Sequence, residues 1–92
     1  MYVILVYDIE LEGEGKRVLP KVFKTCKKYL CRIQNSVFEG ELTPAQLEKL
    51  RSELARYIRK DRDSVIIFKS RTERWLDKEF WGKDEDLTDN VI

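Results

Sequence analysis

Cys31-Arg-Ile-Gln-Asn-Ser-Val-Phe-Glu-Gly-Glu-Leu42 determines how the strands of this chain are connected, because it lies between two helical segments and is rich in strand-forming residues. Asn35, near its middle, favours a tight turn or a bulge. The stretch is therefore predicted to form two short strands, near 31–34 and 36–42.

Another strand is predicted at each end of the folded region. Tyr2-Val-Ile-Leu-Val-Tyr7 is a continuous run of aliphatic and aromatic residues that stops at Asp8, which is typical of a central strand buried on both faces. Ser64-Val-Ile-Ile-Phe-Lys69 is the last clear strand and follows a turn at residues 61–63.

Two amphipathic helices are predicted between these strands. From Lys16 to Leu30 the apolar residues recur at helical spacing, with lysines mostly between them. Proline fits only the first turn of a helix, so Pro20 indicates that the regular helix starts near Leu19. Thr43-Pro44-Ala45-Gln46 predicts a capped helix start, and the apolar stripe that follows continues to about Lys60.

The order β-α-β-β-α-β predicts an α+β, ferredoxin-like sandwich over residues 1–70. Both helices would cover one face of a four-stranded sheet, and the bare opposite face implies a partner. The tail, residues 71–92, carries too many large apolar groups for a solvated segment: Trp75, Leu76, Phe80 and Trp81. We expect this C-terminal segment to add an extra strand to, or to pack across, the second subunit of a twofold homodimer. The alternative is a cap folded back on the same subunit.

Charge is distributed unevenly along the 92 residues, although the net charge is only +1. Residues 1–15 carry four acids and no base, whereas residues 16–34 carry seven bases and no acid. These bases are Lys16, Arg17, Lys21, Lys24, Lys27, Lys28 and Arg32. Ordinary exposed helices intersperse the two signs, so the helical bases are predicted to bind nucleic-acid phosphates, with a solvated helix face as the alternative.

The chain contains no histidine, which excludes Ser-His and Cys-His nucleophile pairs, an imidazole base and His-ligated zinc. Any catalysis must rest on carboxylates, a hard metal ion, or Lys, Tyr, Ser and Cys side chains. Cys26 and Cys31 fit no metal or redox spacing, and Cys26 is expected in the helix core. With no signal peptide and no membrane-spanning run, a reduced cytoplasmic compartment is the expectation.

Asp8, at the end of the first strand, is the candidate ligand for Mg²⁺ or Mn²⁺. A hard cation takes oxygen ligands and keeps several waters, so one or two protein carboxylates suffice. The alternative is that Asp8 accepts hydrogen bonds from loop amides and caps the turn. Glu10, Glu12 and Glu14 could also line a site, although an acidic loop is more often only solvated.

Two arginines flank this region, one at the start of the first helix and one in the next strand. The planar guanidinium groups of Arg17 and Arg32 suit phosphate oxygens. As the alternative, each could pair with a nearby acid such as Glu10 or Glu39.

Ser36 and Phe38 follow the predicted turn. Ser36 lacks a base that would make it a nucleophile, so its expected chemistry is hydrogen bonding to water or phosphate. Phe38 is predicted to lie in the core or to form a wall of a dimer cleft.

Three segments together resemble the CRISPR-associated protein family Cas two. They are Tyr2-Val-Ile-Leu-Val-Tyr-Asp8-Ile9, Arg32-Ile-Gln-Asn-Ser-Val-Phe-Glu-Gly40 and Asp63-Ser-Val-Ile-Ile-Phe68. The middle segment is the specific one. The tail, with Trp75 to Gly82 and Asp89-Asn-Val-Ile92, also looks like the C-termini of this family, where it supplies a strand to the partner's sheet.

The resemblance implies a cytoplasmic homodimer in which two Asp8 side chains face each other across the twofold axis and share Mg²⁺ or Mn²⁺. It implies a metal-dependent endonuclease on RNA or DNA, with a site formed by Asp8, Arg17, Arg32, Ser36 and Phe38. It also implies the central subunit of a complex with the Cas one integrase, which inserts spacers into CRISPR arrays. Double-stranded DNA and single-stranded RNA are therefore the expected nucleic-acid partners.

One position departs from the family pattern. Many members carry Arg-x-Arg at the start of the first helix, whereas Gly15 stands at the first of these positions here and only Arg17 remains. Whether the chain binds phosphate at a catalytic cleft and cleaves efficiently is therefore an open question at the level of the sequence. Two other functions stay open as well: a non-catalytic scaffold that holds a DNA duplex for the integrase, and an RNA-cleaving, toxin-like protein.

Overall fold

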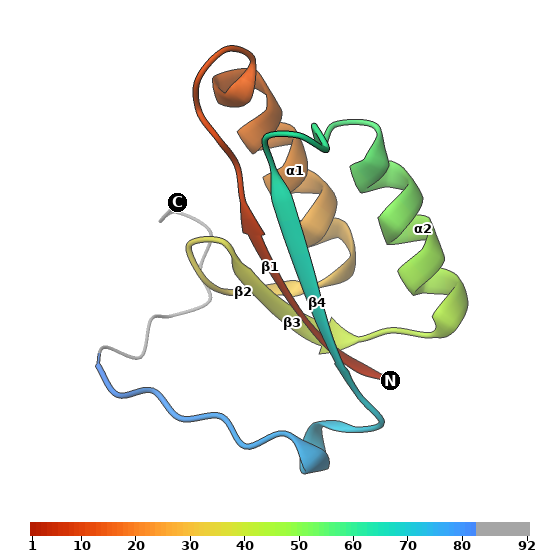
Figure 1. Cartoon of the computed structure of the whole chain (residues 1–92). Helices are drawn as coiled ribbons and strands as arrows, with labels where there is room; N and C mark the ends of the chain where they lie inside the picture. The colour runs from red at the N-terminus through yellow and green to blue at the C-terminus, as the bar shows by residue number, and fades with distance from the viewer. Residues whose placement is uncertain (83–92) are drawn as a thin grey trace.

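The computed structural model describes residues 1–82, which form a four-stranded antiparallel sheet with two helices on one face (Figure 1). The strands are β1 (Tyr2–Asp8), β2 (Cys31–Gln34), β3 (Val37–Glu41) and β4 (Ser64–Ser70). The helices are α1 (Gly15–Tyr29) and α2 (Pro44–Ala55), followed by a 3₁₀ turn, η1 (Glu73–Trp75). The strand order is β2-β3-β1-β4. The predicted α+β class and β-α-β-β-α-β order are confirmed.

The predicted division of the middle stretch at Asn35 is also confirmed. Asn35 has a φ of 31°, in the left-handed region that asparagine tolerates better than most residues. The register of β2 and β3 shifts between Arg32 and Gln34, so a bulge accompanies the turn. This turn brings β3 back between β2 and β1.

Both helices have different ends from those predicted. α1 begins at Gly15 rather than near Leu19, and Pro20 lies inside it. The early start is possible because Glu14 accepts hydrogen bonds from the backbone of Arg17 and Val18, and Pro20 forfeits only one helical bond. α2 begins with the predicted Thr43 capping box but ends at Ala55 rather than near Lys60.

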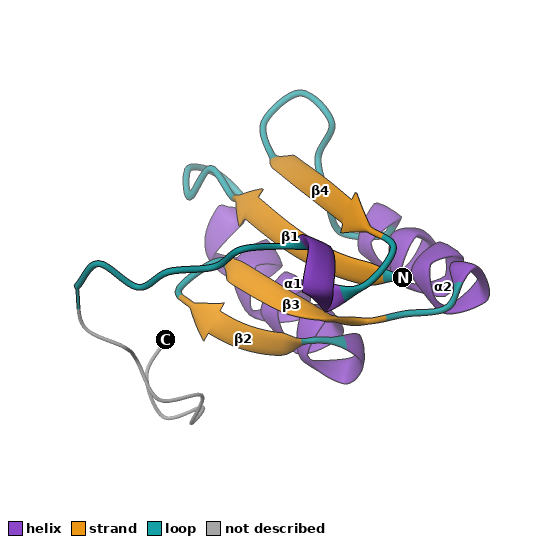
Figure 2. Cartoon of the chain, turned by 90° about the horizontal axis from the view of Figure 1, so that it is seen from below, coloured by secondary structure: helices purple, strands orange, loops and turns teal. Residues whose placement is uncertain are grey.

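The core lies between the helices and one face of the sheet (Figure 2). Phe38 is fully buried at its centre, with ring centroids 5.9 Å from Tyr7 and 5.7 Å from Phe23. Cys26 is fully buried on α1, as predicted, and burial raises the pKa of its thiol to about 12. Among residues 1–82, neither helix has the length and apolar composition needed to span a membrane.

The other face of the sheet is only partly covered. Ile66 and Phe68 of β4 are 49% and 56% exposed. The chain beyond η1 crosses part of this face, where Lys78 pairs with Glu39 at 2.6 Å, and Trp81 stays 93% exposed. Residues 71–82 contain no further strand, and the rest of the predicted extra strand falls on residues 83–92, outside the described part of the chain.

Asp63 and Arg59 tie the loop after β1 to the segment between α2 and β4. The Asp63 carboxylate accepts hydrogen bonds from the Glu10 amide at 3.0 Å and from the amide and guanidinium of Arg59 at 2.9–3.0 Å. The Arg59 guanidinium also donates to the carbonyl oxygens of Glu10 and Glu12. We use the term loop clamp for this set of groups: the side chains of Asp63 and Arg59, together with the backbone groups of Glu10 and Glu12 to which they are hydrogen-bonded. The sequence predicted only a turn here.

The loop clamp predicts how stability depends on pH. The Arg59 hydrogen bonds lower the pKa of Asp63 from 3.8 to about 2, although burial opposes the shift. Because the folded state then binds this proton less tightly than the unfolded state, the stabilisation is complete above about pH 4 and is lost as the pH falls toward 2. Asp63→Asn should lower the free energy of unfolding at neutral pH by roughly 2 kcal/mol. The free energy of unfolding of this variant should also fall less steeply below pH 4 than that of the wild type.

Urea unfolding followed by circular dichroism from neutral pH to pH 2 measures both effects. Asp61→Asn is the matched control, because the Asp61 side chain is 84% exposed and carries the same charge two residues away. This control should keep the wild-type profile. Wild-type stability and wild-type pH dependence in Asp63→Asn would contradict the role given to Asp63.

Candidate functional site

Asp8 ends β1 with its side chain on the sheet face away from the helices. The buried residues of β1 that pack under the helices alternate along the strand: Val3, Leu5 and Tyr7. By the same alternation, Asp8 shares the opposite face with Ile4 and Val6. The candidate metal ligand therefore lies at the end of the partly bare face.

The Asp8 carboxylate is exposed and makes no hydrogen bond or ion pair with any residue from 1 to 82. The alternative predicted for it, capping of the loop amides, belongs instead to Asp63, which accepts the Glu10 amide. Asp8 is therefore accessible to a ligand from solvent.

The glutamates of the following loop do not gather around Asp8. Glu10 pairs with Arg62 at 3.6 Å, and Glu14 pairs with Arg17 at 3.1 Å. Within the described residues, no three acidic or cysteine side chains lie close enough together to hold a metal ion. An accessible carboxylate fits a hard cation that keeps most of its waters, and at this end of the sheet Asp8 is a candidate carboxylate without a partner within residues 1–82.

The two arginines have different surroundings. Arg17 is exposed in the first turn of α1, and its acidic partner is Glu14 rather than Glu10. Arg32 is only 3% exposed, and its Nε donates to the Asn35 carbonyl at 3.2 Å. It has no carboxylate partner in the described chain, because Glu39 binds Lys78 and Tyr2 instead. Arg32 therefore places a buried positive charge at the β2–β3 turn.

Ser36 connects this turn to the end of β1. Its carbonyl accepts a hydrogen bond from the Tyr7 amide at 3.1 Å, one residue before Asp8. Phe38 is a core residue, in agreement with the first of its two predicted positions. Asp8, the turn with Ser36, and the start of α1 thus lie at one end of the sheet, whereas Phe38 supports this end from within the core.

The α1 lysines differ in how strongly the protein already engages them. Lys16 and Lys24 are exposed, and Lys27 is half-buried with its Nζ 5.6 Å from the Phe23 ring centroid. Lys28 forms an ion pair with Glu53 of α2, which also accepts a hydrogen bond from Tyr29. The basic run is therefore partly neutralised at its C-terminal end.

Arg56, which lies outside the predicted run of bases at residues 16–34, is a further basic residue close to α1. Its guanidinium carbon lies 5.9 Å from the centroid of the Tyr57 ring, and Nζ of Lys21 lies 5.7 Å from the same centroid. Both distances fit cation–π contacts. Bases that follow α2, among them Arg56, Arg59 and Lys60, are visible in the sequence. That Arg56 comes close to Lys21 of α1 follows only from the packing of the two helices.

Gly15 lies where the loop after β1 leaves no room for a side chain. A Cβ at this position would lie 2.0 Å from the Glu10 carbonyl oxygen and 3.2 Å from Nη2 of Arg59. The loop therefore approaches the start of α1 too closely for any side chain at position 15. An arginine at position 15 would therefore require a different path of this loop.

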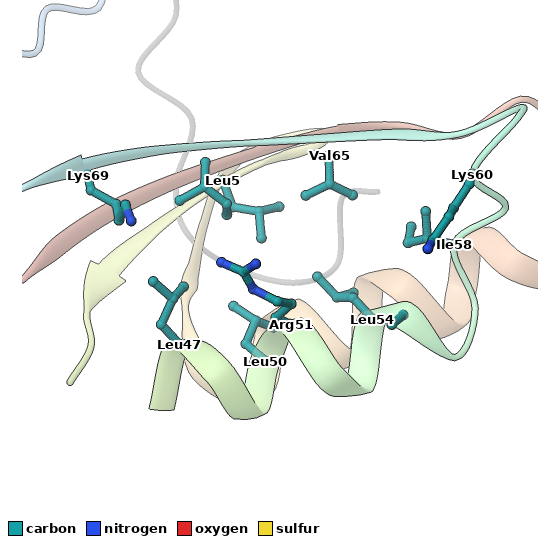
Figure 3. Close-up of a pocket in the computed structure, with 11 residues that line it drawn as sticks. Leu5, Leu47, Leu50, Arg51, Leu54, Ile58, Lys60, Val65 and Lys69 are labelled. Atoms are coloured by element: carbon teal, nitrogen blue, oxygen red, sulfur yellow. The ribbon is translucent and has the colours of Figure 1, made fainter. Parts of the chain in front are cut away.

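A groove of about 490 Å³ lies between α2 and β4 (Figure 3). Apolar side chains of the helix and the sheet face each other across it, among them Leu5, Leu47, Leu50, Leu54 and Val65. Three cations, Arg51, Lys60 and Lys69, also line it. The groove thus offers an apolar surface with positive charge around it.

Comparisons with known proteins agree with this topology. The family model described as CRISPR associated protein Cas2 matches residues 1–78. A CRISPR-associated endoribonuclease Cas2 of Fusobacterium nucleatum subsp. nucleatum is 55% identical over 92 residues, which cover 100% of this chain and 87% of that protein. The CRISPR-associated endoribonuclease Cas2 of Thermotoga maritima is 43% identical over 85 residues, which cover 92% of each chain.

Solved structures show the same fold. One described as the crystal structure of cas2 has a TM-score of 0.80 at 39% identity and covers 100% of this chain and 98% of that one. Streptococcus pyogenes Cas2, in a crystal structure at pH 6.5, has a TM-score of 0.72 at 31% identity, with 87% of this chain and 100% of that chain covered. The matched family region, residues 1–78, includes all four strands, both helices and Asp8. The chain therefore belongs to the CRISPR-associated protein Cas2 family, the Cas two family that its sequence resembles.

Proposed function

We propose that this chain is a cytoplasmic, metal-dependent endonuclease of CRISPR adaptation, which acts as a twofold homodimer on phosphodiester bonds of RNA or DNA. The observation that carries the proposal is the exposed Asp8 carboxylate, which has no partner among residues 1–82 and lies at the end of a partly bare sheet face. The names of the relatives, CRISPR-associated endoribonucleases, support the reaction class.

The bare sheet face supports a face-to-face dimer. Ile66 and Phe68 are about half exposed there, and a second copy related by a twofold axis would cover them. The same axis would place two Asp8 carboxylates on one shared surface. Two carboxylates that approach each other repel unless a cation or a proton lies between them. Dimerisation would therefore create the metal site that a single chain lacks.

A bound Mg²⁺ or Mn²⁺ would supply an activated water and polarise the scissile phosphate. Arg17 would hold phosphate oxygens, and Glu14 is its partner when nucleic acid is absent. The buried Arg32 would contribute a fixed positive charge near the reacting phosphate. The Ser36 hydroxyl would bind water or phosphate, and Phe38 would act only through the packing of this end of the sheet.

The α1 lysines favour a second function, that of a non-catalytic scaffold. The exposed Lys16, Lys21 and Lys24 of two protomers would grip a DNA duplex by its phosphates, while the Cas one integrase docks on the dimer. Gly15 also supports this function, because the loop leaves no room for a second arginine at the start of α1.

The tail, residues 71–92, would complete the dimer at β4 of the partner. β4 is an edge strand, and the groove beside it is apolar with three cations in its lining. In sequence, residues 83–92 carry four acids, one base and the apolar Leu87, Val91 and Ile92. Their charge and their apolar residues complement the groove, which supports a tail that crosses to the second subunit.

The full-length chain is expected to form a dimer that needs both the bare face and the tail. A chain ending at Ser70 and the variant Phe68→Asp should each shift the protein toward monomer, because the first removes the tail and the second puts a charge on the bare face. Multi-angle light scattering measures the mass. Leu11→Asp is the matched control, since Leu11 is exposed to a similar extent, 50% against 56%, but lies in a loop. A folded monomeric full-length chain would refute the dimer.

Asp8→Asn should abolish Mg²⁺- or Mn²⁺-dependent cleavage of short RNA and of duplex DNA, because it removes both carboxylates of the shared site. DNA binding should survive, since the lysines lie on α1. Gel assays of cleavage and of DNA binding measure the two effects. Glu12→Gln is the matched control, because it makes the same charge change on an exposed residue of the adjacent loop.

The same variants separate the enzyme from the scaffold. Lost cleavage with intact spacer integration by the Cas one integrase would assign the biological role to the scaffold, whereas loss of both would assign it to the enzyme. Cleavage that persists in clean Asp8→Asn preparations would exclude Asp8 as the metal ligand.

Duplex DNA should bind without sequence preference and with a steep salt dependence. If about six phosphates are neutralised per dimer, log K falls with log salt at a slope of about −5. Lys24→Gln should reduce this slope by about 2, one phosphate from each protomer. Lys28→Gln, one turn away, should reduce it less, because Glu53 already engages Lys28. Fluorescence anisotropy across a salt series gives the slopes, and equal slopes in wild type and Lys24→Gln would exclude Lys24 as a phosphate contact.

A further inference from the structure

The loop clamp uses both oxygens of the Asp63 carboxylate. The side chain is completely buried. Oδ1 accepts hydrogen bonds from the Glu10 amide at 3.0 Å and from Nη2 of Arg59 at 2.9 Å. Oδ2 accepts from the Arg59 amide at 2.9 Å and from Nε of Arg59 at 3.0 Å. A buried carboxylate satisfied in this way holds its donors in one arrangement.

Arg59 holds the same loop through its carbonyl groups. Its Nη1 donates to the Glu12 carbonyl at 3.1 Å, and its Nη2 donates to the Glu10 carbonyl. Both backbone polar groups of Glu10 are therefore bound by side chains of the segment between α2 and β4. Only a planar guanidinium reaches the Asp63 carboxylate and two carbonyls at once; a lysine ammonium has no such fork.

The loop clamp begins where the β1–β4 ladder ends. The last pair of that ladder is Asp8 with Ser64. Asp63 directly precedes Ser64, and Glu10 lies two residues beyond Asp8, so the bond between them is the next connection after the ladder. The Asp8 carboxylate itself makes no hydrogen bond or ion pair with residues 1–82. Its position is therefore set by the backbone on either side of it.

We propose that Asp63 and Arg59 are positioning residues for Asp8, which fix the backbone beyond the strand end and thereby place the Asp8 carboxylate for a shared cation. This inference rests on the proposed function, in which Asp8 binds the metal. Without the loop clamp, the end of the ladder would fray and the carboxylate would occupy many positions. Residues that orient a metal ligand are typically worth about 10- to 100-fold in metal affinity.

The test uses the full-length protein with Asp63→Asn, and with Arg59→Lys as the milder variant that keeps a positive charge beside Asp63. Free Mn²⁺ measured by electron paramagnetic resonance gives the affinity, at a temperature where circular dichroism shows each variant to be folded. Amide hydrogen exchange at Glu10 gives a second readout that does not depend on metal. Both variants should bind Mn²⁺ about tenfold more weakly or worse and exchange the Glu10 amide faster.

Arg62→Gln is the matched control. Arg62 belongs to the same segment between α2 and β4, pairs with the Glu10 side chain at 3.6 Å and is 45% exposed, so this variant removes a side-chain contact with the loop after β1 but leaves the Glu10 backbone bound. It should keep the wild-type Mn²⁺ affinity and exchange rate. Loss of a positive charge cannot itself weaken the binding of a cation, so an equal loss of affinity in Arg62→Gln would overturn the inference: the contact with the Glu10 side chain, rather than the bonds to the Glu10 backbone, would then set the affinity.

The remaining outcomes separate this inference from the proposed function. Wild-type Mn²⁺ affinity in folded Asp63→Asn and Arg59→Lys, together with no binding in Asp8→Asn, overturns the positioning role and leaves the metal site at Asp8 intact. Mn²⁺ binding that survives unchanged in Asp8→Asn overturns both.

Discussion

β1 pairs with β3 on one side and with β4 on the other, so its residues cannot change face without breaking two ladders at once. This constraint puts Val3, Leu5 and Tyr7 under the helices, where Phe38 packs against them. It also holds Asp8 on the opposite face. A slip of one residue would bury the Asp8 carboxylate in the apolar core without a partner, at a large cost in free energy. The pairing register of β1 with β3 and β4 therefore determines both which residues form the core and where Asp8 lies.

Local signals in the sequence were sufficient for most of the fold. Asn35 predicts its own turn because its backbone preference is local, and Thr43 and Gln46 predict the start of α2 because the capping box spans only four residues. The two helix ends that were predicted wrongly have different causes. α1 starts at Gly15 through local bonds, because the Glu14 carbonyl accepts hydrogen bonds from the amides of Arg17 and Val18. Beyond α2, in contrast, Arg59 is bound by the loop after β1, 47 residues away in sequence. No pattern within a short window reports such contacts.

The site shows the same division between local and distant information. The position of Asp8 at a strand end was predicted, but the sequence left two roles open for it. In the structure the loop is capped by Asp63, which accepts a hydrogen bond from the Glu10 amide, 53 residues away in sequence. The run of α1 lysines was visible in the sequence, whereas the neutralisation of Lys28 by Glu53 depends on the packing of α1 against α2. Charge runs therefore mark a surface, and the tertiary structure decides which of its charges are available.

Gly15 also constrains how this protein can change during evolution. With the loop in its present path, any side chain at position 15 meets the Glu10 carbonyl, so an arginine there would be deleterious on its own. It becomes acceptable only after the loop has moved, and such a move would break the bonds that Arg59 and Asp63 make with Glu10. The effects of substitutions at positions 15, 59 and 63 are therefore not additive. Their order of appearance matters, and lineages that differ at position 15 should differ in the length or path of this loop as well.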